Sequence, residues 1–461
     1  MGNYESIYIY GPPASGKSTL ARALAEALQC KALDTDALIV ARAGCPISEI
    51  FANYGEEHFR ELETMSLMEA IEQSRKERCV VALGGGTLLR QSNREACEKA
   101  GTVICLDAPP QDELNRRLGL APGSRPLGDK SRERAPHYAS FGKRIAASFK
   151  LTDSLVLVGC GLAETFDVPE RTVFDANVAK IHSFAENDVL GIIPSGEVYK
   201  TPATVMNLWH CFAKAGIGRR DVVMACGGGV TGDLTGFAAA TWMRGVPWFN
   251  FPTTLLSMLD ASTGGKTGCD LPEGKNLAGA FHSPRLVVVD TDFLETLPSR
   301  ELNSGYAELL KHCIISGKEP CPVEKLTPAA IADNLSVKVE IVREDPFERT
   351  GRRILLNCGH TVGHAVESAM DYAISHGEAV AIGCVEEARL AVRLGLANPE
   401  WPKELVELFK SAGLPFKMPE TLSFDGLKER MRGDKKRSGN TVTFALPCGW
   451  GEVRSVPVDL S

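Results

Sequence analysis

The sequence predicts an α/β protein in which two α/β domains precede an all-helical one. Three observations support this prediction. Short apolar runs alternate with helical patterns over the first third of the chain, the same alternation begins again near residue 150, and long helical stretches take over from about residue 296. Alternating strands and helices indicate a parallel sheet, with ligands at the carboxyl ends of its strands. We therefore expect domains at residues 1–147, 148–295 and 296–461.

The composition narrows the class of protein. The 461 residues are too many for one compact domain. The net charge of −7 argues against a general nucleic-acid binder, and the longest uncharged stretch, residues 245–259, is too short and too often broken by proline to span a membrane. The 14 cysteines are scattered through apolar runs without a C-x-x-C pair, as in a reducing compartment. We expect a cytoplasmic protein that acts on small molecules.

The first strand leads directly into a phosphate-binding motif. Residues 6–10 have a strand pattern, and Gly11-x-x-x-x-Gly16-Lys17-Ser18 follows at the start of a helical pattern. Glycines let backbone N–H groups surround phosphate oxygens, Lys17 would neutralise the β- and γ-phosphates, and Ser18 would ligate Mg²⁺. This complete Walker A motif predicts a bound nucleoside triphosphate with Mg²⁺. The residues assigned to it are Gly11, Ser15, Gly16, Lys17, Ser18 and Thr19.

Further polar residues follow in an order that narrows the range of possible substrates. Behind the Walker A motif come two acidic residues, an arginine in a helical pattern, a glycine triplet and two more arginines: Asp34, Asp36, Arg60, Gly84–Gly86, Arg125 and Arg134. Each charge taken alone is most simply a solvated surface group. In this order, however, the set resembles shikimate kinase over residues 4–147.

The resemblance implies a P-loop kinase fold with a parallel sheet, and it assigns roles to these residues. Asp34 would contact Mg²⁺ through water. Asp36 would bind the shikimate hydroxyls and orient the attacking one. The carboxylate and ring hydroxyls would be held by Arg60, Gly85 and Arg134, since planar guanidinium groups suit carboxylates.

The polar segment 118–133 is rich in glycine and proline and basic, which is typical of a mobile surface loop. By the same resemblance it is a lid, with Arg125 over the ATP phosphates. One departure is visible, because the family usually continues with a strand and a helix after RAPHY, whereas here the next domain starts almost at once. We therefore expect a trimmed kinase domain. Its expected catalytic residues are Lys17, Asp36 and Arg125.

The second half begins with another strand followed by glycines. Gly227-Gly228-Gly229-x-x-x-Asp233 follows the run VVMAC and suggests pyrophosphate binding, but it lacks the G-x-G-x-x-G spacing. Lys200, Lys266 and Lys275 lie near glycines and suit anionic ligands, although solvated lysines are the simpler interpretation. These patterns alone leave the ligand open.

Three of the nine histidines lie between residues 360 and 376. His360 and His364 are four residues apart and would share a helix face, and His376 starts a second helical pattern. On spacing alone we expect His360 and His364 to bind Zn²⁺, with Glu308 as a third ligand. Core or helix-capping histidines are the alternative.

Seven ordered motifs resemble 3-dehydroquinate synthase over residues 148–461. They are SGExxK, GGGVTGD, FPTTLLSMLDASTGGKTG with LPEGKN, GYAELLKH, LNCGHTVGHA, HGEAVAIG and GDKK. The resemblance implies a Rossmann-like NAD-binding domain and a helical domain that binds metal and substrate. It also changes the metal assignment. The ligands of Zn²⁺ or Co²⁺ become Glu308, His360 and His376, while His364 faces the substrate phosphate and takes part in proton transfer.

The same resemblance assigns the remaining ligand residues. The expected NAD-binding residues are Asp175, Asn177, Glu197, Lys200, Gly228, Gly229, Asp233, Thr253, Thr254, Leu256, Lys266, Lys275, Phe293 and Thr296. The expected substrate-binding residues are Asp260, Lys266, Asn276, Lys338, Arg353, Asn357, His364, Lys435 and Arg244. Arg244 matches an arginine that reaches the substrate of a neighbouring subunit, which implies a homodimer. The expected catalytic residues are Lys266, Lys275, His364 and Arg353.

Together the resemblances imply a bifunctional enzyme of aromatic biosynthesis. One half would phosphorylate the 3-hydroxyl of shikimate with MgATP. The other would convert 3-deoxy-D-arabino-heptulosonate 7-phosphate to 3-dehydroquinate and phosphate, with bound NAD oxidising the substrate and later reducing it again. Two alternatives stay open: a kinase-like domain that senses nucleotides with weak activity, and a synthase that makes a different cyclitol.

Overall fold

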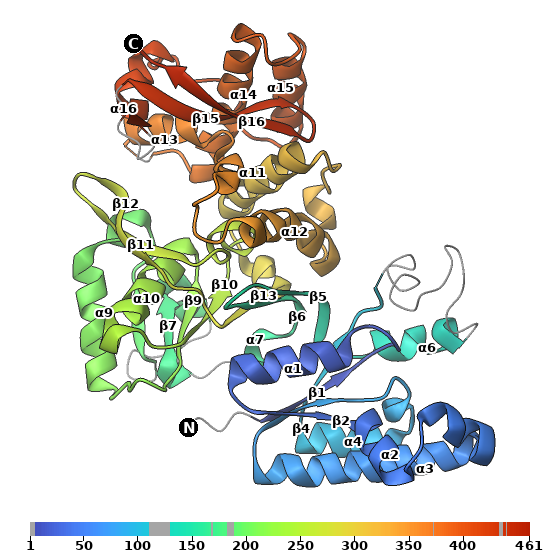
Figure 1. The fold of residues 1–461 in the computed structure, drawn as a ribbon. Helices are drawn as coiled ribbons and strands as arrows, with labels where there is room; N and C mark the ends of the chain where they lie inside the picture. Colours follow the sequence, from blue (N-terminus) through green and yellow to red (C-terminus); the bar gives the residue numbers. More distant parts are fainter. Residues whose placement is uncertain are drawn as a thin grey trace. The chain divides into compact units, whose positions relative to one another are not determined.

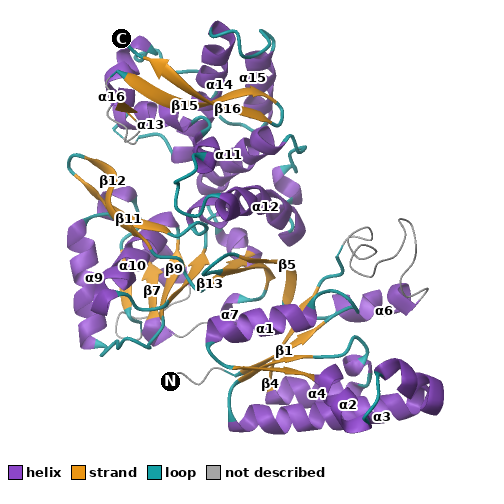
Figure 2. Cartoon of the chain, in the orientation of Figure 1, coloured by secondary structure: helices purple, strands orange, loops and turns teal. Residues whose placement is uncertain are grey.

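The structure, a computed structural model, describes residues 5–109, 130–166, 169–181, 189–371, 373–432, 437–438 and 440–461. The chain divides into two compact units. The first comprises Met1–Arg171 and Pro284–Thr291, and the second comprises Thr172–Ser283 and Asp292–Ser461. Figure 1 follows the chain from end to end, and Figure 2 marks its helices and strands. Among the described residues, no helix has the length and apolar character needed to cross a membrane.

The first unit is built on a mostly parallel sheet. Its strands are β1 (Ser6–Tyr10), β2 (Lys31–Asp34), β3 (Cys79–Ala82), β4 (Gly101–Leu106), β5 (Arg144–Lys150), β6 (Leu155–Cys160) and β13 (Leu286–Asp290). They lie in the order β2-β3-β1-β4-β5-β6-β13, and the β5–β6 pair runs antiparallel. The inner strand β1 is buried along its whole length, as its apolar run predicts. The turns that follow β1, β2 and β3 therefore emerge at one edge of the sheet.

Helices of the first unit connect these strands. They are α1 (Lys17–Leu28), α2 (Thr35–Ala43), α3 (Ile47–Lys76), α4 (Gln91–Ala100), α6 (Lys130–Ala139) and α7 (Ala163–Phe166). The long α3 is interrupted at Gly55, whose φ of 84° is not helical. Tyr8 and Tyr10 of β1 pack with Leu67 of α3 and with Tyr138 and Phe141 in one apolar core. This core fixes the strand ends from which the ligand-binding turns project.

Strand β5 tests the prediction that the first domain is trimmed. It follows α6 and pairs in parallel with β4, so the strand that the sequence analysis expected to be missing is present. Residues 151–154 join it to β6 without a helix between them. The expected junction at residue 147 falls inside β5, a strand whose interior apolar residue Ile145 is buried.

The α/β part of the second unit contains a parallel sheet and a hairpin. The sheet order is β10-β9-β7-β8. The strands are β7 (Thr172–Asp175), β8 (Gly191–Ile193), β9 (Val223–Gly227), β10 (Trp248–Pro252) and the hairpin pair β11 (Lys266–Leu271) and β12 (Gly274–Phe281). The helices are α8 (Ala176–Ile181), α9 (Pro202–Lys214) and α10 (Gly229–Thr241). Val223, Leu234 and Trp248 belong to the core between this sheet and its helices.

The C-terminal part of the second unit is mainly helical. Its helices are α11 (Ser299–Ser316), α12 (Pro328–Glu344), α13 (His360–Ala369), α14 (His376–Arg393), α15 (Trp401–Ser411) and α16 (Lys428–Arg432). An antiparallel sheet of β14 (Arg437–Ser438), β15 (Thr441–Gly449) and β16 (Glu452–Asp459) completes it. The prediction of an all-helical domain therefore missed this sheet. Phe444 and Leu446 of β15 pack in the core that also holds Ile382 of α14, which ties the sheet to the helices.

Candidate functional site

The predicted phosphate-binding motif forms the turn between β1 and α1. Gly11 (φ 137°) and Gly16 (φ 96°) adopt backbone angles that other residues rarely take. A Cβ at Gly11 would lie 2.7 Å from the carbonyl oxygen of Leu106. Ser18 and Thr19 are exposed in the first turn of α1, where backbone N–H groups point towards a bound anion. The turn thus has the backbone geometry of a phosphate cradle.

Lys17 and two aspartates carry the charge at this turn. Nζ of Lys17 donates to the carbonyl oxygen of Pro12 at 2.7 Å, and the hydroxyl of Ser15 donates to the same atom at 2.8 Å. Burial lowers the pKa of Lys17 to about 8, although Asp36 and Asp34 oppose this shift. Asp34 caps α2 by accepting from the backbone N–H of Asp36 at 3.0 Å. Burial, and then the neighbouring Asp34, raises the pKa of Asp36. Asp36 therefore has the environment of a group that accepts a proton or a hydroxyl hydrogen bond.

The glycine triplet after β3 meets an arginine and two tyrosines. Arg60 forms a 2.6 Å ion pair with the buried Glu63. The carbonyl oxygen of Gly85 accepts hydrogen bonds from Tyr138 at 2.7 Å and from Tyr10 at 3.3 Å. A Cβ at Gly85 would lie 2.8 Å from the Pro13 ring, so only glycine lets this strand end approach the phosphate-binding turn so closely. The predicted carboxylate-binding residues thus lie beside the phosphate cradle.

Of the two remaining arginines, one can be placed. Arg134 lies in α6, and it partly offsets the rise that burial causes in the pKa of Tyr138. Its guanidinium is therefore near the Gly85 end of the site. Arg125 lies outside the described residues.

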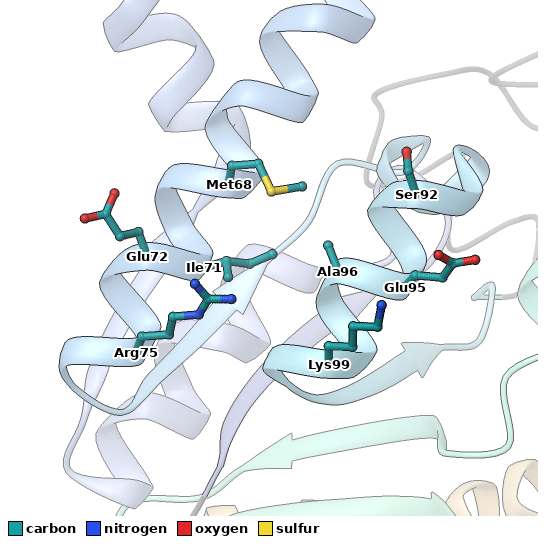
Figure 3. A pocket seen from close by; sticks show the side chains of 8 residues that line it. All are labelled: Met68, Ile71, Glu72, Arg75, Ser92, Glu95, Ala96 and Lys99. Carbon is teal, nitrogen blue, oxygen red and sulfur yellow. The ribbon is translucent and has the colours of Figure 1, made fainter.

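A separate hollow of about 560 Å³ lies between α3 and α4 (Figure 3). Its lining alternates acidic, basic and apolar side chains: Met68, Ile71, Glu72, Arg75, Ser92, Glu95, Ala96 and Lys99. None of the residues predicted for ATP or shikimate is among them.

A compact group of one carboxylate and two imidazoles lies in the second unit. Glu308 belongs to α11, and His360 and His376 are the first residues of α13 and α14. One ligand atom from each lies within 4.8 Å of the other two. Nε2 of each histidine is 3.5 Å from Oε1 of Glu308. Oε1 of this carboxylate is buried and has no hydrogen-bond partner among the described residues, which fits a carboxylate that ligates a metal ion.

Electrostatics keep Glu308 and His360 in their metal-binding states, whereas, against the effect of burial, Glu308 and Glu367 raise the pKa of His376 to about 9, so a metal ion would displace a proton there. Burial would raise the pKa of Glu308, but Lys311, with which it forms an ion pair, and His360 hold that pKa well below its ordinary value. Burial and then Lys311 lower the pKa of His360. The carboxylate is therefore ionised and this imidazole neutral, which are the forms that bind metal ions.

Each imidazole ring has an oxygen atom next to its Nδ1: a hydrogen-bond acceptor for His360 and an ion-pair partner for His376. Nδ1 of His360 lies 3.1 Å from the carbonyl oxygen of Cys358, and Nδ1 of His376 lies 3.6 Å from Oε2 of Glu367. Both rings thus direct Nε2 towards Glu308. His364 lies beside them, with its ring centroid 5.2 Å from that of His360 and 5.8 Å from that of His376. The structure brings together the three residues named by the resemblance, and it leaves His364 at the border of the group.

Buried cations lie close to the Glu308 group. Lys338 of α12 forms a 2.6 Å ion pair with Asp260. Burial lowers the pKa of Lys338, whereas Lys338 and Lys311 together hold that of Asp260 well below its ordinary value despite burial. Nδ2 of Asn357 is buried and has no partner among the described residues. These side chains suit a polar, anionic ligand.

Arg353 is held by the backbone around it. Its guanidinium donates to the carbonyl oxygens of Gly264 at 3.1 Å and Pro346 at 2.9 Å. Its own N–H donates to Asp345 at 3.2 Å. Lys266, in contrast, is half exposed and pairs with Glu348 at 2.7 Å. Arg244 is exposed with a φ of 70°, and Lys435 lies outside the described residues.

The residues predicted for NAD gather at the carboxyl ends of β7, β9 and β10. Asp175 ends β7 and accepts from Ser195 at 2.7 Å, Gly228 precedes α10, and Thr253 follows β10. Thr254, Leu256 and Gly229 continue these two turns, and Asn177 donates its N–H to Asp175 at 2.8 Å. Phe293 and Thr296 lie in the turn Thr291–Thr296 after β13. The ends of parallel strands are where dinucleotides bind in such sheets.

Two lysines connect segments that carry residues predicted to bind NAD. Lys200 pairs with Asp233 at 2.6 Å and donates to Asn276 at 2.7 Å. Lys275 of β12 lies 3.5 Å from Glu197 and donates to Glu367 at 2.9 Å. The SGExxK motif and the hairpin are therefore joined by ion pairs.

Three further residues of the site, Lys311, Asp345 and Glu367, were not predicted from the sequence. Lys311 is fully buried one helical turn after Glu308. Asp345 caps the segment that carries Arg353, and Glu367 accepts from Lys275. The spacing Glu308–Lys311 and the run His360, His364, Glu367 along one helix face were the available signals.

Three family models match the chain. A shikimate kinase model matches residues 13–153, and the N- and C-terminal models of 3-dehydroquinate synthase match residues 190–304 and 305–437. The 3-dehydroquinate synthase of Synechococcus sp. (strain ATCC 27144) is 45% identical over 278 residues, which cover 57% of this chain and 75% of that protein.

Two solved structures resemble the chain over 68% of its length. A 2-deoxy-scyllo-inosose synthase complexed with carbaglucose-6-phosphate, NAD⁺ and Co²⁺ is 26% identical with a TM-score of 0.60, and 97% of it is covered. The 2-epi-5-epi-valiolone synthase of Streptomyces hygroscopicus subsp. jinggangensis 5008, with NAD⁺ and Zn²⁺ bound, is 27% identical with a TM-score of 0.59, and 94% of it is covered.

Proposed function

The chain belongs to the 3-dehydroquinate synthase family and also carries a shikimate kinase domain, and from this premise we propose which of its residues perform each reaction. One polypeptide thus combines two enzymes of the shikimate pathway. The observation that carries the synthase assignment is the buried Glu308, whose Oε1 faces the Nε2 atoms of two imidazoles.

The ion at Glu308, His360 and His376 is Zn²⁺ or Co²⁺. Two imidazoles and one carboxylate are ligands that these ions accept, and the related synthases hold Co²⁺ or Zn²⁺ together with NAD⁺. When bound, the cation would supply Lewis-acid activation of a substrate hydroxyl, and NAD would supply reversible hydride transfer at the adjacent carbon. The cofactor is held by the strand-end residues from Asp175 to Thr296.

The side chains around this centre bind and orient the heptulosonate phosphate. Lys266, Arg353 and His364 hold its phosphate, and His364 and the phosphate oxygens handle the proton that leaves the neighbouring carbon. Lys338, balanced by Asp260, holds the substrate carboxylate end. Asn276 and Asn357 are assigned to the same substrate, as is Lys435, which lies outside the described residues. Burial of Lys338 and Arg353 costs free energy that the phosphate and carboxylate groups of the substrate offset.

The first unit transfers phosphate from ATP to the 3-hydroxyl of shikimate. Lys17 neutralises the phosphates, and Ser18 and Asp34 hold Mg²⁺, the latter through water. Asp36 orients the attacking hydroxyl; its raised pKa suits that task. Arg60, the Gly85 backbone and Arg134 hold the carboxylate and ring hydroxyls, and the resemblance assigns Arg125, outside the described residues, to the ATP phosphates.

Two further assignments accompany these roles. Arg244, exposed on a strained turn, reaches a second copy of the chain, so the synthase acts as a homodimer. All fourteen cysteines are free thiols, which fits the reducing cytoplasm.

One purified sample tests the assignment. Phosphate release from the heptulosonate phosphate with NAD⁺ and Zn²⁺ is measured beside shikimate-dependent ADP formation with MgATP. We expect both activities. Synthase activity with shikimate-independent or absent ADP formation would identify the first unit as a nucleotide sensor and contradict the kinase proposal.

A further inference from the structure

Glu367 occupies a position between the two ligand sites of the second unit. It lies in α13, seven residues after His360, so it projects from the same face of the helix as His360 and His364. Only 6% of its surface is exposed. Its two carboxylate oxygens face different partners. Oε1 accepts from Nζ of Lys275 at 2.9 Å, and Oε2 lies 3.6 Å from Nδ1 of His376.

Each partner belongs to a different site. His376 directs its other nitrogen to Glu308, the carboxylate of the proposed metal-binding group. Lys275 lies on strand β12 among the residues assigned to NAD, and Glu197 at 3.5 Å is a further acidic neighbour. A metal-ligating histidine needs an acceptor on its second nitrogen, because that bond fixes the tautomer and the ring plane. His360 has the backbone oxygen of Cys358 for this purpose. His376 has Glu367.

We propose that Glu367 is a positioning residue that serves both sites at once. Through Oε2 it holds the imidazole of His376 in the tautomer that presents Nε2 to the metal, and through Oε1 it holds the ammonium of Lys275 in the NAD cleft. The inference rests on the proposed function, because it takes His376 as a metal ligand and Lys275 as a cofactor residue.

The substitution Glu367→Gln separates the two contacts. A carboxylate offers two acceptor oxygens, whereas an amide offers one oxygen and one NH₂ group. Glutamine can therefore accept from His376 or from Lys275, but it presents a donor to the other. Its volume is nearly unchanged, so packing around residue 367 is kept.

Metal and cofactor binding are measured on the full-length protein, without turnover. Zn²⁺ affinity is determined by competition with a chelating indicator, and NAD⁺ affinity by titration of the metal-free protein. We expect Glu367→Gln to weaken Zn²⁺ binding about 10- to 100-fold. We also expect weaker NAD⁺ binding than in the wild type. Glu404→Gln, an equal charge change at an exposed site on α15, serves as the matched control and should alter neither affinity.

A double-mutant cycle with Lys275→Met tests the route to the cofactor. If Glu367 acts on NAD⁺ through Lys275, adding Glu367→Gln to Lys275→Met changes NAD⁺ affinity no further, while Zn²⁺ affinity still falls. If Glu367→Gln lowered NAD⁺ affinity equally in the wild type and in Lys275→Met, the proposed effect of Glu367 on NAD⁺ through Lys275 would be wrong. If Glu367→Gln bound Zn²⁺ as tightly as the wild type, the proposed role of Glu367 in positioning His376 would be wrong.

Two further variants distinguish these outcomes from misfolding and from an error in the proposed function. Glu367→Asp keeps the charge but is shorter by one methylene, so it cannot span both partners, and we expect it also to weaken Zn²⁺ binding. Normal Zn²⁺ affinity in this variant would contradict the proposal. His360→Ala tests the metal site itself. If the wild type bound no Zn²⁺, or if His360→Ala kept the bound Zn²⁺, the proposed metal site would be wrong whatever the role of Glu367.

Discussion

The phosphate-binding turn of the first unit and the Glu308 group of the second are built in opposite ways. The turn uses consecutive residues, and its geometry comes from backbone angles that glycines permit. The Glu308 group uses side chains from three helices whose positions depend on packing. The comparison teaches that a site made of backbone can be found in a short motif, whereas a site made of converging side chains depends on the whole domain.

The largest expected effect separates the two sites completely. His360→Ala removes one of three metal ligands, so we expect bound metal to be lost and synthase activity to fall at least about 100-fold. Shikimate-dependent ADP formation should stay at the wild-type rate. Metal content after desalting and the two activity assays on one sample provide the measurement. A parallel loss of kinase activity would show that the two sites are coupled.

The reciprocal change is Lys17→Ala in the phosphate-binding turn. Removing the cation that faces the transferred phosphate should lower kcat of the kinase about 100- to 1000-fold. Metal content and synthase activity should not change. Steady-state rates at saturating MgATP and shikimate measure the effect, with Lys150→Ala on the exposed end of β5 as the control. Kinase activity near wild type in Lys17→Ala would refute the assignment of this turn to ATP.

A smaller effect on activity is expected for Asp345, whose side chain holds the backbone around Arg353. Asp345 accepts from the N–H groups of Arg349 at 2.7 Å, Thr350 at 3.1 Å and Arg353 at 3.2 Å. Asp345→Asn places an NH₂ group against one of these donors and should shift Arg353. We expect KM for the heptulosonate phosphate to rise about tenfold while kcat changes less. An equal fall in kcat with unchanged KM would contradict a role in substrate binding.

The same carboxylate gives a pH dependence of stability. Burial opposes its charge, but the three backbone N–H groups outweigh burial and lower the pKa of Asp345 to about 2. A depressed folded-state pKa stabilises the protein above the unfolded value near 4 and loses that contribution as pH falls towards 2. The difference in unfolding free energy between wild type and Asp345→Asn should therefore shrink from pH 5 to pH 2. Denaturant unfolding at several pH values measures it, and a constant difference would contradict the assignment.

The smallest effect concerns the strand end beside the phosphate turn. Tyr138→Phe removes the 2.7 Å hydrogen bond to the carbonyl oxygen of Gly85. A buried hydrogen bond of this kind contributes about 1 kcal/mol, so KM for shikimate should rise about fivefold with little change in kcat. Tyr10 still donates to the same oxygen at 3.3 Å, which limits the loss. An unchanged KM for shikimate would mean that Gly85 does not position this substrate.

The sequence predicted the local features well. The Walker A motif lies on the expected strand–turn–helix, and the strand pattern at residues 6–10 corresponds to β1. The same analysis overlooked β5 and the hairpin of β15 and β16. These strands were missed because their pairing partners, β6 for β5 and each other for β15 and β16, define them more than their own composition does.

The amino-acid sequence by itself determined where phosphate-binding turns form, because glycine conformations and helix starts depend on a few neighbouring residues. It also named the histidines and lysines available for chemistry. Only the tertiary structure decided which of them meet. Spacing paired His360 with His364, yet packing of α11, α13 and α14 turns His360 and His376 towards Glu308. Packing also buries Lys311 and places Glu367 between two sites, since burial and charge pairing depend on elements far apart in the chain.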